Sequence, residues 1–310
     1  MSASLRVGLI GAGVFGGYHA SKIAENNFVK FAGIFDADAN RAAELASENN
    51  CQTVPSIDEL LRTTDAVIIA TPAKTHYQLA KQALLANCHV LVEKPLALSA
   101  NDAIELVDIA AAKKRILQVG HQERLVCQTM GLLDIEEVPS RLFAVREAPP
   151  PQGERNLDVS VVWDLMIHDL DLAHTLTGSG REVLSAAGIV GQYETLDQCS
   201  ADVLMNGCRT RFVASRSAEQ RRRHLTLEYE SGEIFVDFID RTVRNSTKYS
   251  LDSDLSRFLP DPLGTADYAF IEACLGNVRC IVPGRDAASA VATAERIEQM
   301  ATTELGAVHG

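Results

Sequence analysis

Several features of secreted, metal-binding and membrane proteins are missing from this sequence. Its 310 residues include seven cysteines, an odd number, with no Cys-x-x-Cys pair and no other metal-type spacing. We therefore expect free thiols in a reducing cytoplasm and no metal site. No apolar stretch approaches the about 20 residues of a membrane-spanning helix. The apolar run Val7–Ile10 is too short for a signal peptide and is expected to be a strand.

Basic residues are also in short supply. Lys and Arg total 29 against 41 Asp and Glu, a formal net charge of −12 at pH 7. This balance disfavours nucleic acid and anionic membrane surfaces as partners. A small anionic substrate stays compatible with it, because such a substrate needs only a local basic pocket. The length is about twice that of a usual domain, so two domains are expected.

The first part of the chain alternates short apolar runs with helical patterns. Five runs are expected to be strands: Leu5–Ile10, Phe28–Phe35, Ala66–Ala70, His89–Val92 and Ile116–Val119. Strands that alternate with helices indicate a doubly wound parallel sheet. We therefore expect residues 1–121 to form an N-terminal Rossmann domain.

The pattern changes after residue 121. Six segments are expected to be strands with few helices between them: Leu142–Glu147, Val183–Val190, Ser200–Met205, Thr210–Ser215, His224–Glu230 and Glu233–Phe238. The main helix of this region is predicted over Val162–Leu176. Residues 122–284 are therefore expected to form a C-terminal α/β domain with a large open, mainly antiparallel sheet.

A glycine motif follows the first predicted strand. Gly11 permits a tight turn, Gly13 lets the backbone approach a pyrophosphate, and Gly16 lets the next helix pack on the strand. The first helical residues, Val14 and Phe15, offer N–H groups to the phosphates. This motif, between a strand and a helix, predicts a dinucleotide site.

The end of the second strand carries the residue that selects the cofactor. Asp36 lies twenty residues after Gly16, where a carboxylate accepts hydrogen bonds from the adenosine ribose. Its charge opposes a 2′-phosphate, so NAD is favoured over NADP. Arg41 keeps NADP as an alternative, because a nearby arginine can receive that phosphate.

Two further segments follow predicted strands and belong to the expected cofactor site. Thr71 and Pro72 suit a loop beside the cofactor, and two roles stay open for His76, a cofactor contact or a packing histidine. Glu93 and Lys94 end a buried strand, where ligands collect in such sheets. A lysine there can exchange protons with a substrate, so Lys94 is a candidate catalytic residue.

A second candidate constellation lies on the predicted helix Val162–Leu176. Asp164 and His168 are four residues apart and therefore share one face of an α-helix. Apolar residues fill much of the remainder, so the helix is expected to be largely buried. A buried histidine beside a carboxylate suits a general base for a hydroxyl proton. A structural ion pair is the alternative.

Taken together, the segments GAGVFGGYH, TPAKTH, EKP and Asp-x-x-x-His resemble the Gfo/Idh/MocA oxidoreductases, the glucose–fructose oxidoreductase and inositol dehydrogenase family. The resemblance implies hydride transfer between a nicotinamide and a sugar or polyol carbinol. It implies catalytic roles for Lys94, Asp164 and His168, which would also bind the substrate. It further implies a second domain used for substrate binding and for homodimer or homotetramer contacts, and a last helix, 285–305, that packs back on the first domain.

The segments Asp158–Asp169 and Gly120–Arg124 resemble more narrowly a branch that includes UDP-N-acetylglucosamine 3-dehydrogenases. The usual Arg-Phe-Asn-Pro continuation after Arg124 is absent. We expect a nucleotide sugar such as UDP-N-acetylglucosamine to be oxidised at a ring hydroxyl, or the ketosugar to be reduced. Arg124 and Arg155, and also Arg146, are either diphosphate contacts or structural ion pairs. The run 221–223 is either a solvated sheet edge or a phosphate or subunit contact.

Three other functions compete with this one. The first is a free sugar, inositol or dihydrodiol dehydrogenase, which keeps the chemistry and changes the substrate. The second is a non-catalytic NAD-binding sensor, against which the intact Lys94, Asp164 and His168 argue. The third is an NAD-dependent glycosidase, whose tyrosine and histidine arrangement the sequence does not contain.

Overall fold

The computed structural model describes residues 4–151, 157–178, 180–191, 194–254 and 260–308, with side chains through residue 303. The chain divides into two compact units. The first unit comprises Met1–Gln122 and Asp261–Ala288, and the second comprises Glu123–Pro260 and Ser289–Gly310. The first unit's main segment ends one residue after the boundary expected at 121. Residues 261–284 were expected in the second domain and instead belong to the first unit.

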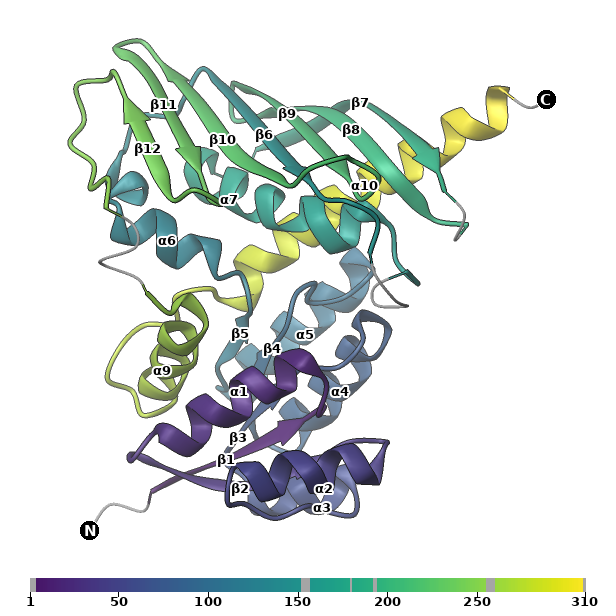
Figure 1. The fold of residues 1–310 in the computed structure, drawn as a ribbon, viewed down its shortest axis with the longest axis vertical. Helices are drawn as coiled ribbons and strands as arrows, with labels where there is room; N and C mark the ends of the chain where they lie inside the picture. The colour runs from purple at the N-terminus through teal and green to yellow at the C-terminus, as the bar shows by residue number, and fades with distance from the viewer. Residues whose placement is uncertain (1–3, 152–156, 179, 192–193, 255–259, 309–310) are drawn as a thin grey trace. The chain divides into compact units, whose positions relative to one another are not determined.

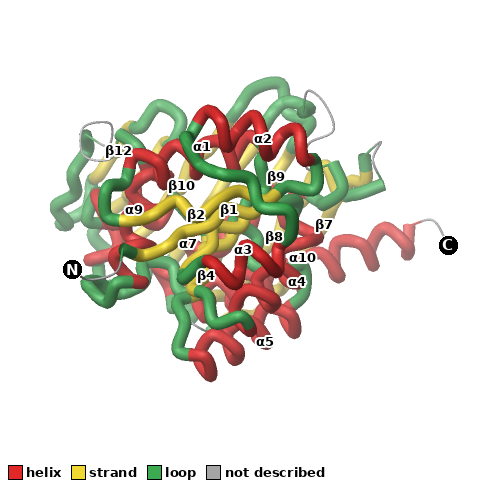
Figure 2. Tube along the Cα trace, turned by 90° about the horizontal axis from the view of Figure 1, so that it is seen from below, coloured by secondary structure: helices red, strands yellow, loops and turns green. Residues whose placement is uncertain are grey.

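The first unit is a five-stranded parallel sheet in the order β2-β1-β3-β4-β5. Its strands are β1 (Leu5–Ile10), β2 (Val29–Phe35), β3 (Ala66–Ile69), β4 (His89–Val92) and β5 (Leu117–Val119). Its helices are α1 (Val14–Glu25), α2 (Ala39–Glu48), α3 (Ile57–Thr63), α4 (Ala73–Leu85), α5 (Ala100–Lys113) and α9 (Pro262–Cys274). Figure 2 shows α1 and α2 on one side of the sheet and α4 and α5 on the other. The predicted Rossmann fold is confirmed.

Local sequence explains where these elements begin. The side chains of Asp38, Ser56 and Ser99 accept hydrogen bonds from first-turn N–H groups and so start α2, α3 and α5. The chain pairs β2 on one side of β1 and β3 on the other. The strand order therefore reverses at the carboxyl end of β1, where such sheets bind ligands.

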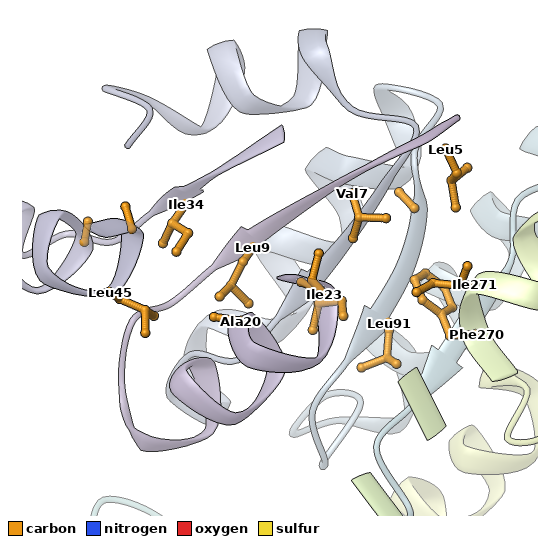
Figure 3. Packing of buried hydrophobic residues seen from close by; sticks show 14 residues of the cluster. Leu5, Val7, Leu9, Ala20, Ile23, Ile34, Leu45, Leu91, Phe270 and Ile271 are labelled. Carbon is orange, nitrogen blue, oxygen red and sulfur yellow. The ribbon is translucent and has the colours of Figure 1, made fainter. Parts of the chain in front are cut away.

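A shared hydrophobic core joins β1, β2, α1, α2 and α9 (Figure 3). Leu9 and Ile34 from the sheet meet Ile23 of α1, and all three are fully buried. Phe270 and Ile271 of α9 belong to the same cluster and are also fully buried. Burying such a side chain stabilises a fold by roughly 1.5–3 kcal/mol. Helix α9 therefore belongs to this core although it lies far away in the sequence.

The second unit is built on a seven-stranded sheet in the order β12-β11-β10-β6-β9-β8-β7. Its strands are β6 (Arg141–Glu147), β7 (Arg181–Val190), β8 (Leu196–Met205), β9 (Cys208–Ser215), β10 (Arg222–Tyr229), β11 (Gly232–Asp237) and β12 (Thr242–Asn245). Only the β6–β9 pair among these is parallel. The mainly antiparallel open sheet is thus confirmed, with β12 as an additional edge strand.

Helices cover one face of this sheet. They are α6 (Glu123–Thr129), the 3-10 turn η1 (Leu132–Asp134), the π-helical turn η2 (Val162–Met166), α7 (Ile167–Thr177) and α10 (Gly284–Val308). Figure 1 shows α7 and the greater part of α10 along the sheet. The inward side chains of the strands, such as Phe212, Leu225 and Leu227, are fully buried.

The last helix begins in one unit and continues in the other. Residues 285–305 were expected to pack on the first domain; residues 284–288 belong to the first unit, and the chain from Ser289 onward belongs to the second. Two polar contacts hold this later part of the helix. Thr293 is hydrogen-bonded to Nε2 of the buried His174 at 2.8 Å, and Glu298 accepts a hydrogen bond from Ser160. These contacts tie α10 to α7 and to the segment before η2.

Candidate functional site

The three motif glycines after β1 are explained by different features of the structure. Gly11 has a φ of +104°, and a Cβ atom there would lie 2.3 Å from the carbonyl oxygen of Ala70. A Cβ on Gly16 would lie 2.0 Å from the carbonyl oxygen of Gly11. A Cβ on Gly13 would meet no described atom within 4 Å. Packing therefore requires Gly11 and Gly16, whereas Gly13 leaves space that a ligand can use.

Helix α1 presents its N-terminus next to that space. Gly13 is the N-cap and, as glycine, brings no side chain to the first N–H groups. Val14 opens the helix with 60% of its surface exposed, and Phe15 follows it. Such an N-terminus binds anions through its N–H groups and the positive end of the helix dipole. The residues present therefore fit the pyrophosphate of a dinucleotide.

Asp36 is anchored beside the glycine turn. Its Oδ2 accepts the Ala12 N–H at 2.6 Å, and its Oδ1 accepts the Asp38 N–H at 2.8 Å and Nη2 of Arg41 at 2.9 Å. Burial raises the pKa of Asp36, but these donors outweigh burial and lower it overall. The carboxylate is therefore ionised and fixed at the end of β2, with Arg41 paired to it.

His76 braces two loops at the same sheet edge. Its Nδ1 lies 2.7 Å from the carbonyl oxygen of Pro95, and its Nε2 lies 2.8 Å from that of Thr71. The ring is 1% exposed. Both nitrogens contact backbone, which favours the packing alternative over a cofactor contact. Pro72 is the N-cap of α4, so His76 connects the start of that helix to the segment after β4.

Lys94 follows β4 directly, at the edge where β1 also ends, and its peptide bond to Pro95 is cis. The preceding Glu93 is buried, and a Cβ on Gly120 would lie 2.6 Å from its Oε1. Nε2 of His19 lies 3.3 Å from the same oxygen. Glu93 was expected to bind cofactor. The structure instead buries its carboxylate and pairs it with His19.

Glu93 thus belongs to a buried charge cluster with His19 and Asp267. Nδ1 of His19 donates to Oδ2 of Asp267 on α9 at 2.8 Å. Burial lowers the pKa of His19, but Asp267 and Glu93 outweigh burial and raise it to about 10. Burial raises the pKa of Glu93, but His19 outweighs it and lowers the value. His19 is therefore an imidazolium near neutrality. Sequence reasoning assigned no role to His19 or Asp267, although His19 lies in the glycine motif.

The second unit carries its own candidate residues on η2 and α7. A regular α-helix was predicted from Val162, but Val162–Met166 forms a π-helical turn in which the Ile167 N–H bonds the Val162 carbonyl. His168 lies in the first turn of α7. Between residues 161 and 174, the partly exposed residues are Asp164, Leu165 and His168. Asp164 and His168 are therefore both partly open to solvent, and their joint role in a site stays a prediction.

His168 has a carboxylate partner that sequence reasoning missed. Its Nδ1 lies 2.8 Å from Oε2 of Glu123, the first residue of α6. Oε1 of Glu123 accepts Nη1 of Arg146 at 2.9 Å, and Nε and Nη2 of Arg146 donate to Asp169 at 3.0 and 2.8 Å. Burial raises the pKa of Glu123, but His168 and Arg146 outweigh burial and hold it well below its usual range.

The arginines expected to meet a substrate anion behave differently from one another. Arg124 is 3% exposed and donates Nε and Nη2 to Asp171, both at 2.7 Å. Arg146 is buried in the pair with Asp169 described above, so both are structural ion pairs rather than diphosphate contacts. Arg155 lies outside the described residues. Arg223 is different: 43% of its side chain is exposed, with Nη1 3.4 Å from Glu123.

The described ranges contain neither a metal-type cluster nor a membrane-spanning helix. Among these residues, no group of three or more His, Cys, Asp or Glu side chains is placed to hold a metal ion. No helix within them combines the length and apolar character needed to cross a membrane.

Comparison with known proteins shows the family to which this chain is related. The model for the GFO_IDH_MocA oxidoreductase family, NAD-binding Rossmann fold, matches residues 5–121. UDP-N-acetylglucosamine 3-dehydrogenase of Acidithiobacillus ferrooxidans is 37% identical over 241 residues, which cover 77% of this chain and 76% of that protein. An inositol 2-dehydrogenase of Corynebacterium glutamicum is 31% identical over 189 residues, or 58% of this chain and 56% of that protein.

A solved structure agrees with these relatives. The structure of the Acidithiobacillus ferrooxidans UDP-N-acetylglucosamine 3-dehydrogenase GnnA superimposes with a TM-score of 0.86 at 32% identity, covering 97% of this chain and 99% of that one. The glycine turn, the placement of Lys94 after β4 and these similarities lead to one conclusion: this chain is an oxidoreductase and belongs to the Gfo/Idh/MocA family.

Proposed function

We propose that the protein oxidises a ring hydroxyl of a nucleotide sugar such as UDP-N-acetylglucosamine with NAD, and runs the reverse reduction of the ketosugar. The observation that carries the chemistry is the position of Lys94, which follows β4 at the carboxyl edge of the sheet where the glycine turn also lies. The relatives named above carry the substrate class.

In this proposal the chain's first unit holds the dinucleotide. Its contacts are the N–H groups around the α1 N-terminus for the pyrophosphate, Asp36 for the ribose and the loop before α4 at the nicotinamide end; the residues are Gly11, Gly13, Val14, Phe15, Gly16, Asp36, Thr71 and Pro72. When bound, the nicotinamide supplies hydride acceptance. The ionised Asp36 supports NAD, because its charge opposes the 2′-phosphate of NADP.

The proton chemistry falls to three side chains. His168 takes the hydroxyl proton while the hydride leaves the same carbon, so that the carbinol becomes a carbonyl. Lys94 polarises the oxygen and shares in the proton transfer. Asp164, on the open side of the segment that carries His168, orients the substrate hydroxyls. The reverse reaction uses the same groups with the proton returned to the oxygen.

Arg223 is the residue that we assign to the substrate's diphosphate. Its side chain is partly exposed, and its Nη1 lies 3.4 Å from Glu123, which also contacts His168. A guanidinium suits a phosphate because it offers paired N–H donors in one plane. Arg124, in contrast, is buried against Asp171. This assignment favours a nucleotide sugar over a free sugar, which carries no diphosphate.

The decisive experiment is nicotinamide reduction with NAD and UDP-N-acetylglucosamine, with a carbonyl trap to pull the equilibrium. Parallel reactions contain other nucleotide sugars, inositol and free hexoses. Lys94→Ala should lower turnover by about 10²-fold or more while cofactor still binds, the usual scale for a lost acid–base group. Near-normal turnover in that variant contradicts the assignment of Lys94. Turnover of free polyols alone contradicts the substrate class, and cofactor binding without any turnover indicates a sensor.

We also propose that the protein self-associates as a dimer or tetramer and works in a reducing compartment such as the cytoplasm. The strands β6 and β7 carry exposed apolar side chains, among them Phe143, Leu184 and Ile189. All seven cysteines are free thiols, which suits a reducing compartment. Light scattering of the wild type and of Ile189→Lys tests the first point, because a lysine there should favour the monomer.

A further inference from the structure

We propose that Glu123 is a positioning residue for His168: it fixes the imidazole as the Nδ1–H tautomer and thereby makes Nε2 the nitrogen that exchanges a proton with the substrate. This inference rests on the proposed function for the catalytic role of His168. Its structural half, the tautomer, does not depend on that role.

The geometry separates the two oxygens of Glu123. Oε2 lies 2.8 Å from Nδ1 of His168, and Oε1 lies 2.9 Å from Nη1 of Arg146. An ionised carboxylate only accepts hydrogen bonds, so Nδ1 must donate. In a neutral imidazole the other nitrogen then carries the lone pair. Proton transfer with a hydroxyl therefore has to use Nε2.

The carboxylate stays ionised and stays in place. Arg146 is buried between Glu123 and Asp169 and joins β6 to α6 and α7. Its guanidinium uses all three nitrogens in these contacts, one toward Glu123 and two toward Asp169. A buried arginine so held fixes the direction of Glu123, and Glu123 in turn fixes the ring of His168. Serine-hydrolase triads use a carboxylate in the same way to set a catalytic histidine.

Other charged groups face this cluster from each neighbouring element. Arg223 approaches Glu123 from β10, and Asp164 lies on η2, close to His168 in the sequence. Arg124 of α6 and Asp171 of α7 pair with each other. Burial raises the pKa of the Cys127 thiol on α6, which keeps that group neutral. Within the described cluster, the imidazole is the group whose ordinary titration range lies near neutrality.

The chain offers a matched pair of variants. Glu123→Gln removes one negative charge at 2.8 Å from Nδ1 and lets an amide N–H₂ face the ring, which favours the other tautomer. Asp171→Asn also removes one buried carboxylate from an ion pair between α6 and α7, but that carboxylate bonds Arg124. The two changes disturb the same pair of helices, and only the first alters the partner of His168.

The first readout needs no substrate. The protein is labelled with ¹⁵N-histidine, and His168→Asn identifies the signal of His168 among eight histidines. With the pH raised until the ring is neutral, the nitrogens of the wild type and of Asp171→Asn should show Nδ1 protonated and Nε2 with a lone pair. Glu123→Gln should lose this pattern. If Glu123→Gln does not fold, the wild-type spectrum alone decides which nitrogen carries the proton.

The second readout is the pH dependence of turnover. Glu123→Gln should lower kcat by about 10²-fold, toward the full contribution of an acid–base group. Its acid limb should move to lower pH, because the imidazolium loses its carboxylate, while KM changes far less. Asp171→Asn should retain the wild-type profile. The inference is overturned if wild-type His168 carries its proton on Nε2, or if the two variants match in tautomer and profile. Absence of turnover on every substrate contradicts the proposed function instead, and the spectrum still decides the tautomer.

Discussion

Alkaline pH should destabilise the first unit through His19. This ring is 1% exposed, and its nitrogens contact the carboxylates of Asp267 at 2.8 Å and Glu93 at 3.3 Å. Deprotonation leaves those carboxylates buried without the imidazolium that now balances them. The perturbation is therefore a change in pH from 6.5 to 10, and the quantity measured is the free energy of unfolding.

The size of the effect follows from the shift in pKa. A free imidazole has a pKa of 6.5, and the buried ring has one of about 10. Because the folded value is the higher one, the stabilisation is complete below about pH 6.5 and is lost as the pH rises through about 10. At about 1.4 kcal/mol per pH unit the limit is about 5 kcal/mol. Burial raises the pKa of Asp267, which opposes the pairing, so we expect a loss of about 2–4 kcal/mol.

Urea denaturation at each pH supplies the measurement. The reference is the double variant His19→Gln and Asp267→Asn, which retains a hydrogen-bonding pair that does not titrate. Circular dichroism follows both units, while fluorescence of Trp163, the single tryptophan, reports on the second unit and separates the two transitions. If wild type and double variant differ by a constant amount across this range, within about 0.5 kcal/mol, His19 is not a buried imidazolium and the reasoning fails.

Three other predictions concern ligand binding. Gly13→Ala should leave the melting temperature unchanged and weaken dinucleotide binding in calorimetry. Gly16→Ala should also lower the free energy of unfolding by about 1–3 kcal/mol, because its Cβ would lie 2.0 Å from a carbonyl oxygen. Equal stability of the two variants contradicts this prediction. Asp36→Ala should weaken NAD more than NADP, and an unchanged preference would show that Asp36 does not contact the ribose. Arg223→Ala should raise KM for a nucleotide sugar by roughly 10–100-fold, the loss of a hydrogen bond to a charged group, and an unaltered KM in steady-state kinetics would remove Arg223 from the substrate site.

The Rossmann strands were predictable from local sequence. The runs Leu5–Ile10 and His89–Val92 match β1 and β4 residue for residue. Apart from Arg6 and His89, both runs consist of apolar residues and glycine, because parallel strands are covered on both faces. The glycine turn was equally predictable from the sequence. A Cβ atom at Gly11 or Gly16 would clash with backbone atoms, so these positions require glycine.

Helix α6 and the π-helical turn were not predicted, each for a physical reason. Helix α6 has seven residues and opens with Glu123 and Arg124, which are buried through ion pairs rather than through an apolar stripe. Hydrophobic periodicity cannot detect such a helix. The residues Val162–Met166 suit α- and π-helical turns alike, so their pattern predicts a helix without distinguishing its hydrogen-bond spacing.

The partners of the candidate catalytic groups were beyond sequence reasoning for a different reason. His168 meets Glu123 across 45 residues, and His19 meets Asp267 across 248. A single sequence gives no information about which of two distant positions come into contact. Arg124 is an example: its motif predicted contact with a substrate anion, whereas the structure pairs its guanidinium with Asp171, 47 residues away.

The π-helical turn gives this segment one residue more than an α-helix of the same course would need. A π turn holds one residue more than an α turn, so deleting a single residue from Val162–Met166 would leave an uninterrupted α-helix. If the deletion spares Asp164, that residue would stand three or four residues before His168, which are the spacings of one face of an α-helix. The segment should therefore tolerate the loss of one neighbouring residue better than the substitution of Asp164 or His168.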